Sequence, residues 1–487
     1  MNTSIIRYIL GQVLRLEGLF LVLPCVVALI YGEASGLSFL ATALLCIMLG
    51  TLMTYKKPTS HTFYLKEGCI TTALSWIVLS IFGALPFCIS GEIPSFTDAM
   101  FETVSGFTTT GASILSDVEA MSHAGLIWRS FTHWIGGMGV LVFLLAIVPL
   151  SGGSNINLMR AESPGPSVGK LVPKMKLTAR ILYAIYFVMT VIMIILLLIG
   201  KMPLFQALCT AFGTAGTGGF GFLNDGMASF SPYLQWVITI FMILFGVNFN
   251  AYYYILFRQF SKAFAMEEVR YYFLIILSAV AIIFIDILDM FTSAFEALTH
   301  AAFQVGSIIT TTGYSTTDFN LWPQTSKCVL VLLMFIGACA GSTGGGMKVS
   351  RFVILFKNIG KEFHSYIHPR SVKKIQLDGK PVEHDVVRSI NVYCFTFAII
   401  FCASVLVISL EGYDFTTTFT AVAATFNNIG PGLELVGPMS NYGHLSGLST
   451  WVLTFDMLAG RLELFPLLLL FHPTIWRDYF HQKSPQK

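Results

Sequence analysis

The residues of this chain best suited to chemistry form a short threonine- and glycine-rich segment, Ser105–Ala112, which reads Ser-Gly-Phe-Thr-Thr-Thr-Gly-Ala. Glycine lets a backbone adopt positive φ or approach its neighbours closely, so that successive carbonyl groups can point the same way. Rings of such carbonyls can replace the hydration shell of a cation. Degraded copies of the segment recur at Gly213–Gly219, Ile309–Tyr314 and Phe426–Pro431. A loop used four times predicts one pore lined by four copies.

Each loop follows a short semi-apolar stretch that must position it. These stretches are Thr97–Val104, Leu204–Ala211, Thr292–Phe303 and Phe415–Ala424. They predict half-helices of about ten residues, too short for a bilayer that needs about 20. Each would place the partial negative charge of its C-terminus near the pore axis, which favours cations. We align the copies on Gly111, Gly218, Gly313 and Gly430. The alternative is that these glycines only permit close helix packing.

The composition places the loops in a membrane protein. Of the 487 residues, 55% are hydrophobic and only 11% are charged, whereas soluble domains carry roughly 25% charged residues. The mean hydropathy is +0.73. Ten apolar runs predict ten spans, at residues 12–31, 37–53, 70–90, 128–150, 181–200, 233–257, 271–290, 328–356, 392–410 and 450–471. Eight of them bracket the four loops.

The predicted fold class is therefore an all-α polytopic membrane protein. Four pseudo-equivalent units of span, pore helix, filter loop and span surround one central pore, and two extra transmembrane helices precede them. The predicted divisions are 1–69 for the N-terminal helices, 70–177 for repeat 1, 178–269 for repeat 2, 270–387 for repeat 3 and 388–487 for repeat 4 with the C-terminal tail.

Lysine and arginine predict the orientation, because short cytoplasmic loops collect them. Most of the 29 lie in the polar stretches 55–69, 151–180, 258–270, 357–388 and 472–487. Both termini are therefore expected in the cytoplasm, with the glycine loops open to the outside. The net charge of +3 reflects this asymmetry and indicates no nucleic-acid partner. The nine cysteines are scattered singly, which is typical of small buried hydrophobes.

The apolar run 328–356 is longer than one span requires, and its middle holds Gly341 and the triplet Gly344, Gly345 and Gly346. Each glycine costs a helix about 1 kcal/mol, so we expect two helices joined by an intramembrane loop. That loop would lie just below the third filter loop, where it could obstruct ion exit. The alternative is a passive kink.

Arg461 lies near the middle of the last apolar run, where a charge costs about 2.5 to 3.5 kcal/mol on insertion scales. Neither Glu463 nor Asp456 is well spaced on a helix to pair with it. We expect Arg461 to contact the intramembrane loop around Gly344–Gly346, the candidate gate, or to form a positive barrier in the ion path. A purely structural ion pair is the alternative. Lys348 could serve beside it or reach the cytoplasmic face.

Several acidic residues surround the predicted filter. Glu102 lies in the first pore helix, and scaffolding of loop amides is its expected role. An acid follows every filter loop: Asp117, Glu119, Asp225, Asp318 and Glu434. One hypothesis is an outer ring that concentrates cations, and ordinary solvated loops are the alternative. No HExxH motif supports an intramembrane enzyme.

These residues carry a resemblance. The pattern Phe101–Ala112 resembles the first pore loop of the Trk/Ktr/HKT superfamily of potassium transporters. Similar matches are Ser163–Pro166, Gly341–Lys348, His368–Arg370 and Gly460–Glu463, and the two extra N-terminal spans point to the TrkH branch. The resemblance covers nearly the whole chain.

By that resemblance the site residues fall in two groups. The filter comprises Thr109, Thr110, Gly111, Gly216, Thr217, Gly218, Thr311, Thr312, Gly313, Asn428, Ile429 and Gly430, which bind potassium. The gate comprises Gly344, Gly345, Gly346, Lys348 and Arg461. Each loop offers a single aligned glycine, so we expect potassium and rubidium to pass comparably and sodium less well.

The resemblance also implies a multi-pass protein of the bacterial cytoplasmic membrane, in contact with lipid and assembled as a homodimer. Potassium is the substrate, and no cofactor is bound covalently. A nucleotide would act only through a cytoplasmic TrkA-type nucleotide-binding partner, for which loops 151–180 and 357–388, including Lys373 and Lys374, are the predicted docking surface. Proton- or sodium-coupled symport on the same architecture is the alternative.

Overall fold

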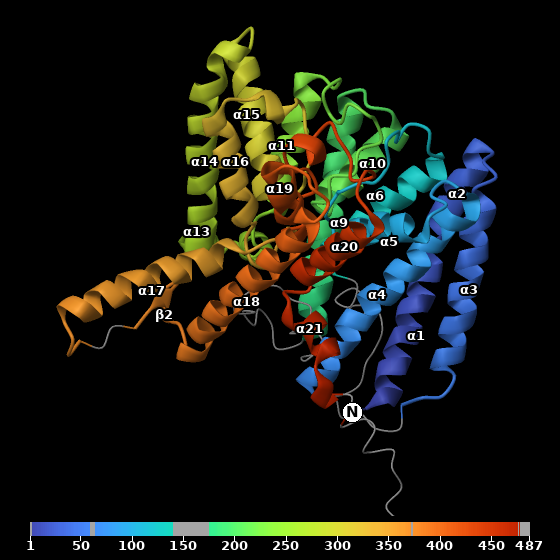
Figure 1. Ribbon diagram of the computed structural model, residues 1–487, viewed down its shortest axis with the longest axis horizontal. Coiled ribbons are helices and arrows are strands. Elements are labelled where there is room, and N and C mark those ends of the chain that lie inside the picture. The colour runs from blue at the N-terminus through green and yellow to red at the C-terminus, as the bar shows by residue number, and fades with distance from the viewer. Residues whose placement is uncertain (1, 59–63, 140–174, 372–373, 476, 478–487) are drawn as a thin grey trace, which may run out of the picture.

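The structure is a computed structural model that describes residues 2–58, 64–139, 175–371, 374–475 and 477. It is almost entirely helical (Figure 1). Within the described residues, the only strands form a two-residue hairpin between β1 (Gln376–Leu377) and β2 (Lys380–Pro381). Much of the loop 151–180, including Ser163–Pro166, lies outside the described residues, as does Lys373.

Three N-terminal helices are followed by four successive helical units. The N-terminal helices are α1 (Thr3–Phe20), α2 (Val22–Tyr31) and α3 (Gly36–Thr54). Unit 1 contains α4 (Leu65–Ser90), α5 (Phe96–Phe107) and α6 (His123–Gly137). Unit 2 contains α9 (Met175–Ile199), α10 (Leu204–Ala215), α11 (Pro232–Phe245), α12 (Phe249–Leu256) and α13 (Phe260–Ala265).

Unit 3 contains α14 (Glu267–Ile287), η1 (Leu288–Met290), α15 (Ala294–Ile309), η2 (Phe319–Leu321), α16 (Gln324–Phe335) and α17 (Val349–Ile367). Unit 4 contains α18 (His384–Ser409), α19 (Phe415–Phe426), η3 (Glu434–Val436), α20 (Gly447–Arg461), α21 (Phe465–Leu468) and η4 (Leu469–Phe471). The pore helices α5, α10, α15 and α19 have 12 to 16 residues, which confirms the four predicted half-helices.

Six helices among the described residues are long and apolar enough to cross a membrane. Two of the predicted spans, 233–257 and 450–471, are not continuous helices. The first bends by 92° between α11 and α12, where a Cβ on Gly246 would lie 2.4 Å from the Tyr272 hydroxyl and Asn248 caps α12. The second ends at Arg461, because Glu463 and Leu464 take positive φ. The run 128–150 continues beyond the described residues.

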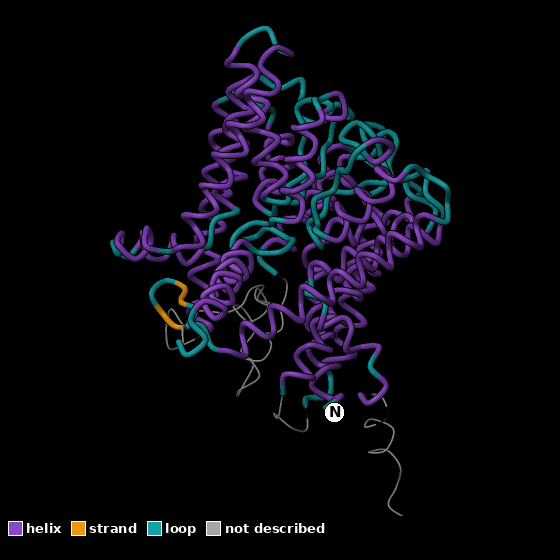
Figure 2. Tube along the Cα trace, turned by 60° about the vertical axis from the view of Figure 1, so that its left-hand side comes forward, coloured by secondary structure: helices purple, strands orange, loops and turns teal. Residues whose placement is uncertain are grey.

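The pore helices sit at the centre because each second helix of a unit packs against two of them. Helix α6 contacts α5 and α10, α11 contacts α10 and α15, α16 contacts α15 and α19, and α20 contacts α19 and α5. The last pair joins unit 4 to unit 1 and closes the circle. Figure 2 shows loops running through this helical centre, and Figure 1 shows α1 and α3 at one edge and α17 projecting at the other.

Candidate ion filter and gate

All four pore helices end in the same backbone motif. The N–H of Thr110 bonds to the Ser105 carbonyl at 2.9 Å, five residues back, and the N–H of Thr109 bonds to Gly106 at 3.1 Å. The same pair of bonds recurs in the other three loops at 2.8 to 3.1 Å. This is the Schellman termination, which requires a left-handed residue after the helix. Thr109, Thr217, Thr311 and Asn428 occupy that position with φ of 55°, 53°, 60° and 56°.

Threonine is unusual in this conformation, because a β-branched side chain crowds a left-handed backbone. Such strain costs on the order of 1 to 3 kcal/mol per residue and persists only where the surroundings impose it. Its repetition in three loops, with the more tolerant asparagine in the fourth, indicates that the loops share one required backbone path.

Two residues further on, each loop has a glycine with positive φ. These are Gly111, Gly219, Gly313 and Gly430, with φ of 80°, 80°, 86° and 99°. The predicted alignment on Gly218 is therefore wrong by one residue. Gly216 has ordinary right-handed geometry at the end of α10, and the trio equivalent to Thr109–Gly111 is Thr217, Gly218 and Gly219. Because Gly218 and Gly219 are adjacent, the sequence alone is compatible with either glycine as the equivalent of Gly111. The position at which α10 ends selects Gly219.

These glycines make the contacts that join the four loops into a ring. A Cβ on Gly111 would lie 2.1 Å from the Gly218 carbonyl oxygen, and one on Gly219 would lie 1.8 Å from that of Thr312. The corresponding distances are 2.0 Å from Gly313 to Ile429 O and 2.7 Å from Gly430 to Thr110 O. The positive-φ glycine of each loop thus faces a carbonyl group of the next unit, and the glycine of unit 4 faces a carbonyl group of unit 1. Only glycine fits this approach.

A cavity of about 280 Å³ opens directly outside the ring. All four ring glycines line it, together with loop residues that follow them, such as Tyr314 and Pro431. Its lining is rich in backbone, serine and asparagine groups. The ring therefore has a polar approach from the side predicted to face outward.

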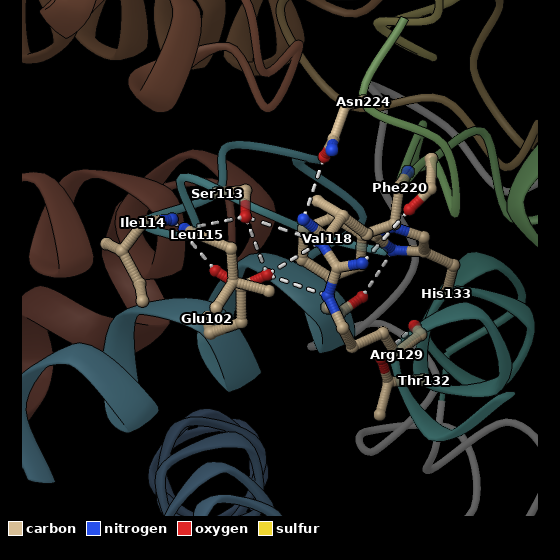
Figure 3. A network of polar contacts seen from close by, with 12 residues as sticks. Glu102, Ser113, Ile114, Leu115, Val118, Arg129, Thr132, His133, Phe220 and Asn224 are labelled. Atoms are coloured by element: carbon tan, nitrogen blue, oxygen red, sulfur yellow. Dashed lines mark hydrogen bonds and ion pairs between the residues drawn. The ribbon is translucent and has the colours of Figure 1, made fainter. Parts of the chain in front are cut away.

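A buried network behind the first loop holds the ring in place (Figure 3). Glu102 pairs with Arg129 at 2.8 Å, and both side chains are at most 2% exposed. Glu102 also accepts from the Ser113 hydroxyl at 2.9 Å and from the Ile114 N–H at 3.0 Å, which confirms its predicted contact with loop amides. Arg129 donates onward to the Gly221 carbonyl at 3.0 Å, so the pair ties loop 1 to loop 2.

His133 makes a second tie between the same loops. Its Nδ1 lies 2.7 Å from the Gly106 carbonyl, and its Nε2 accepts from the Phe220 N–H at 3.2 Å. A carbonyl can only accept and an amide can only donate, so the ring is neutral with its proton on Nδ1. A Cβ on Gly218 would lie 2.1 Å from this imidazole ring, so only glycine fits at that position.

The outer acids occupy the loops above the filter, and some also join units. Asp117 accepts from the Asn224 side chain at 2.9 Å, and Glu119 accepts from the backbone N–H of Asn224 at 3.0 Å. The bond from Asn224 lowers the pKa of Asp117. Asp318 caps η2, and Asn320, two residues further on, accepts from the Glu434 N–H at 2.9 Å. Asp117, Glu119 and Asp318 therefore have structural partners for their carboxylates, and the predicted effect of the outer acids on cations stays a prediction.

The predicted break in the run 328–356 is confirmed, and the gate loop, residues 336–348, lies directly beneath the ring. The Gly345 N–H donates to the Thr311 hydroxyl at 2.7 Å. A Cβ on Gly345 would lie 2.7 Å from that of Asn428, and one on Gly344 would lie 3.0 Å from the Thr310 carbonyl. The glycine triplet therefore lets the loop touch filter residues of units 3 and 4.

Lys348 and Arg461 both bind the gate loop. The Lys348 ammonium is 2% exposed and donates to the carbonyls of Gly344 and Gly345, so it does not reach the cytoplasmic face. Arg461 donates to the Thr343 carbonyl at 3.0 Å and to the carbonyls of Gly136 and Gly137 at the end of α6. Its contact with the gate loop matches the expectation, and it bridges units 1 and 3 from unit 4.

Sequence reasoning missed the contacts of two acids, of which one is partly exposed and the other is buried. Arg351 forms an ion pair with Glu463 and stacks on the Tyr393 ring, 3.9 Å from its centroid, so the start of α17 is tied to the break after α20. Glu268, 5% exposed, accepts a hydrogen bond from the Ala340 N–H of the gate loop. For Glu463 the available signal was a charge in an apolar run without a partner three or four residues away, whereas Glu268 lies in the polar stretch 258–270 and gave no such signal.

The comparisons with known proteins agree with this geometry. A family model described as TrkH, cation transport protein, matches residues 35–478. The chain is 35% identical to the Trk system potassium uptake protein TrkH of Salmonella typhimurium, over 98% of this chain and 100% of that protein. It is 34% identical to the Trk system potassium uptake protein TrkG of Escherichia coli K12, with the same coverage.

A solved structure has the same fold. The crystal structure of the potassium transporter TrkH from Vibrio parahaemolyticus matches with a TM-score of 0.88 and 32% identity, over 98% of this chain and 100% of that one. Because the family model and these relatives extend over most of the length, the chain belongs to the TrkH family of cation transport proteins.

Proposed function

We propose that this protein takes up potassium ions across the bacterial cytoplasmic membrane through a channel-like pore, with the ring of four loops as its selectivity filter. The observation that carries the proposal is the closed circuit of glycine-to-carbonyl contacts from Gly111 through Gly219 and Gly313 to Gly430. A ring of backbone carbonyls on four left-handed turns can replace the hydration shell of a monovalent cation.

The pore helices supply the charge preference. All four end at the ring, so each contributes the partial negative charge of its C-terminus, about half an elementary charge. Cations are therefore favoured over anions. The relatives of similar length are named as potassium uptake proteins, which supports potassium as the ion.

The gate loop is the proposed barrier to exit. Its Gly345 N–H bonds to Thr311 of the filter, and the ammonium of Lys348 lies under the ring, bonded to the loop. Arg461 bonds both to the loop and to the end of α6. Two cationic side chains beside a cation path oppose conduction electrostatically. These contacts support a pore that is closed at this loop, so that conduction would require the loop to move.

Control by a nucleotide-binding partner and assembly as a homodimer are further parts of the proposal. The hairpin β1–β2 and the projecting helix α17 give the segment 357–388 an exposed surface at one end of the molecule (Figure 1). Lys374 is exposed there. Replacing Lys374 with Glu should weaken binding of an acidic regulatory subunit in a pull-down assay, and undiminished binding would remove this surface from the proposal.

Flux through reconstituted protein tests the pore. Proteoliposomes should accumulate rubidium and potassium comparably, and sodium less well, when a membrane potential is the only driving force. Uptake that instead needs a proton or sodium gradient would favour the coupled symporter. Deleting Gly344, Gly345 and Gly346 should raise the leak of the pore, whereas unchanged or reduced flux would exclude the gate role. A chain with Gly360→Ala, on the exposed part of α17 where a Cβ meets nothing within 4 Å, is the control.

A further inference from the structure

A single buried carboxylate joins both ends of the gate loop. Oε1 of Glu268, in the first turn of α14, accepts from the Ala340 N–H at 2.6 Å and from the Ser350 N–H at 3.1 Å. Ala340 lies in the first half of the loop, and Ser350 lies in the first turn of α17 just after the loop. We propose that Glu268 is the positioning residue that holds the gate loop in its closed form by pinning these two points to α14.

The other carboxylate oxygen extends the clamp to unit 2. Oε2 of Glu268 accepts from the Asn248 side chain at 3.3 Å, and Asn248 lies at the sharp bend between α11 and α12. The same bend receives the loop through its backbone, because the Cys339 N–H bonds to the Gly246 carbonyl and the Phe249 N–H bonds to the Gly341 carbonyl, both at 3.0 Å. The broken helix of unit 2 is therefore a cradle for the gate loop, and Glu268 fastens the loop into it.

The energetic reasoning follows from burial. Glu268 is 5% exposed, and the three bonds satisfy a carboxylate that would otherwise be costly in an apolar setting. Bonds from neutral donors to a charged acceptor are about twice as strong as neutral ones. If the loop leaves the cradle together with the start of α17, the bonds from Ala340 and Ser350 both break, so the clamp favours the closed form. This consequence for ion flux rests on the proposed gate.

The neighbouring residue provides a matched control. Glu267 also lies in the first turn of α14, but it pairs with Lys357 and bonds to Asp378 in the cytoplasmic hairpin instead of the loop. Removing either carboxylate changes the charge at the helix N-terminus equally. Only Glu268 contacts the gate loop.

A native cysteine reports on the loop without any ion flux. Cys339 precedes Ala340 and is fully buried. Its rate of reaction with N-ethylmaleimide, followed in the full-length protein by mass spectrometry of the Cys339 peptide, measures how often the loop leaves the cradle. Glu268→Ala should raise this rate about tenfold, and Glu267→Ala should leave it unchanged. Equal rates in wild type and Glu268→Ala would overturn the proposal.

The conservative variant separates positioning from charge. Glu268→Gln keeps an oxygen that can accept from both Ala340 and Ser350, but the acceptor is neutral, so its labelling rate should lie between those of wild type and Glu268→Ala. A rate equal to that of Glu268→Ala would mean that only charge matters and would also overturn the proposal. If Glu268→Ala does not fold, Ser350→Pro tests the same clamp, because it removes one donor within the first turn of α17, where proline is tolerated.

Flux measurements then distinguish this inference from the proposed function. Faster labelling with raised rubidium leak in Glu268→Ala supports both. Faster labelling without added leak supports the clamp and counts against the loop as a gate. Added leak without faster labelling counts against the clamp, because the loop then stays in its cradle.

Discussion

The hydroxyl oxygen of Thr311 lies 2.7 Å from the backbone nitrogen of Gly345 and accepts its hydrogen bond. Thr311 is the left-handed residue that ends the third pore helix, and Gly345 is the centre of the glycine triplet in the gate loop. The filter and the proposed gate are thus joined by one direct bond. A residue that shapes the backbone of the ring also holds the loop below it, so that the loop cannot leave the ring without breaking this bond.

Replacing Thr311 with valine tests this bond. Valine keeps the size and the β-branch but cannot accept, so the buried Gly345 N–H loses its partner at a cost of about 1 to 3 kcal/mol. We expect the closed state to weaken and rubidium leak in proteoliposomes to rise by several-fold or more. Thr311→Ser keeps the hydroxyl and is the control. An unchanged rubidium leak in Thr311→Val would show that this bond does not hold the gate loop closed.

Gly219→Ala tests the corrected register of the second loop. The new methyl would lie 1.8 Å from the Thr312 carbonyl oxygen on a backbone with φ of 80°, so the ring must distort. Rubidium uptake should fall to background. Gly221→Ala, two residues on, meets only Leu223 O at 3.4 Å and should transport normally. Normal uptake by Gly219→Ala would place this glycine outside the filter.

The buried pair Glu102–Arg129 should be required for stability. Arg129→Met leaves the Glu102 carboxylate uncompensated and should lower the free energy of unfolding by about 3 to 5 kcal/mol. Glu102→Gln should also destabilise the protein. In the double variant the loss should be smaller than the sum of the single losses, since the two groups interact directly. Thermal unfolding in detergent measures all three, and strictly additive losses would contradict the coupling.

The outer acids should matter only at low ionic strength. Exposed charges are screened beyond about 10 Å at 0.1 M salt. Changing the acids to their amides should raise the KM for rubidium in dilute buffer, with the difference vanishing at high ionic strength. The set is Asp117, Glu119, Asp225, Asp318 and Glu434. Matched changes at exposed Glu362 and Asp385 in the segment 357–388 should have no effect. An equal KM in all variants would assign the five acids to loop structure alone.

Much of the architecture could be predicted because it depends on local features of the chain. The length of each apolar run separates spans from half-helices, as for Phe415–Phe426, and the cluster Gly344–Gly346 marks a place where a helix cannot continue. Both signals are read within some 20 residues. Glu102 could likewise be predicted as a scaffold, because a charged side chain in an apolar pore helix requires nearby donors.

The register of the second loop could not be predicted in this way. Gly218 and Gly219 have the same intrinsic freedom, and the choice between them depends on where α10 ends and on which glycine meets the Thr312 carbonyl of the next unit. The bends at Gly246 and after Arg461 have the same origin, because neighbouring helices impose them on runs that remain apolar.

The sequence by itself therefore determined the membrane class, the four half-helices and the break in the third unit, because run length, hydrophobicity and glycine content act locally. Only the tertiary structure decided which partners the buried charges take. Arg351 finds Glu463 across 112 positions of sequence, and Glu268 finds Ala340 across 72. A buried charge must be satisfied by whichever group lies beside it, and that group is chosen by the closing of the ring and not by spacing along the chain.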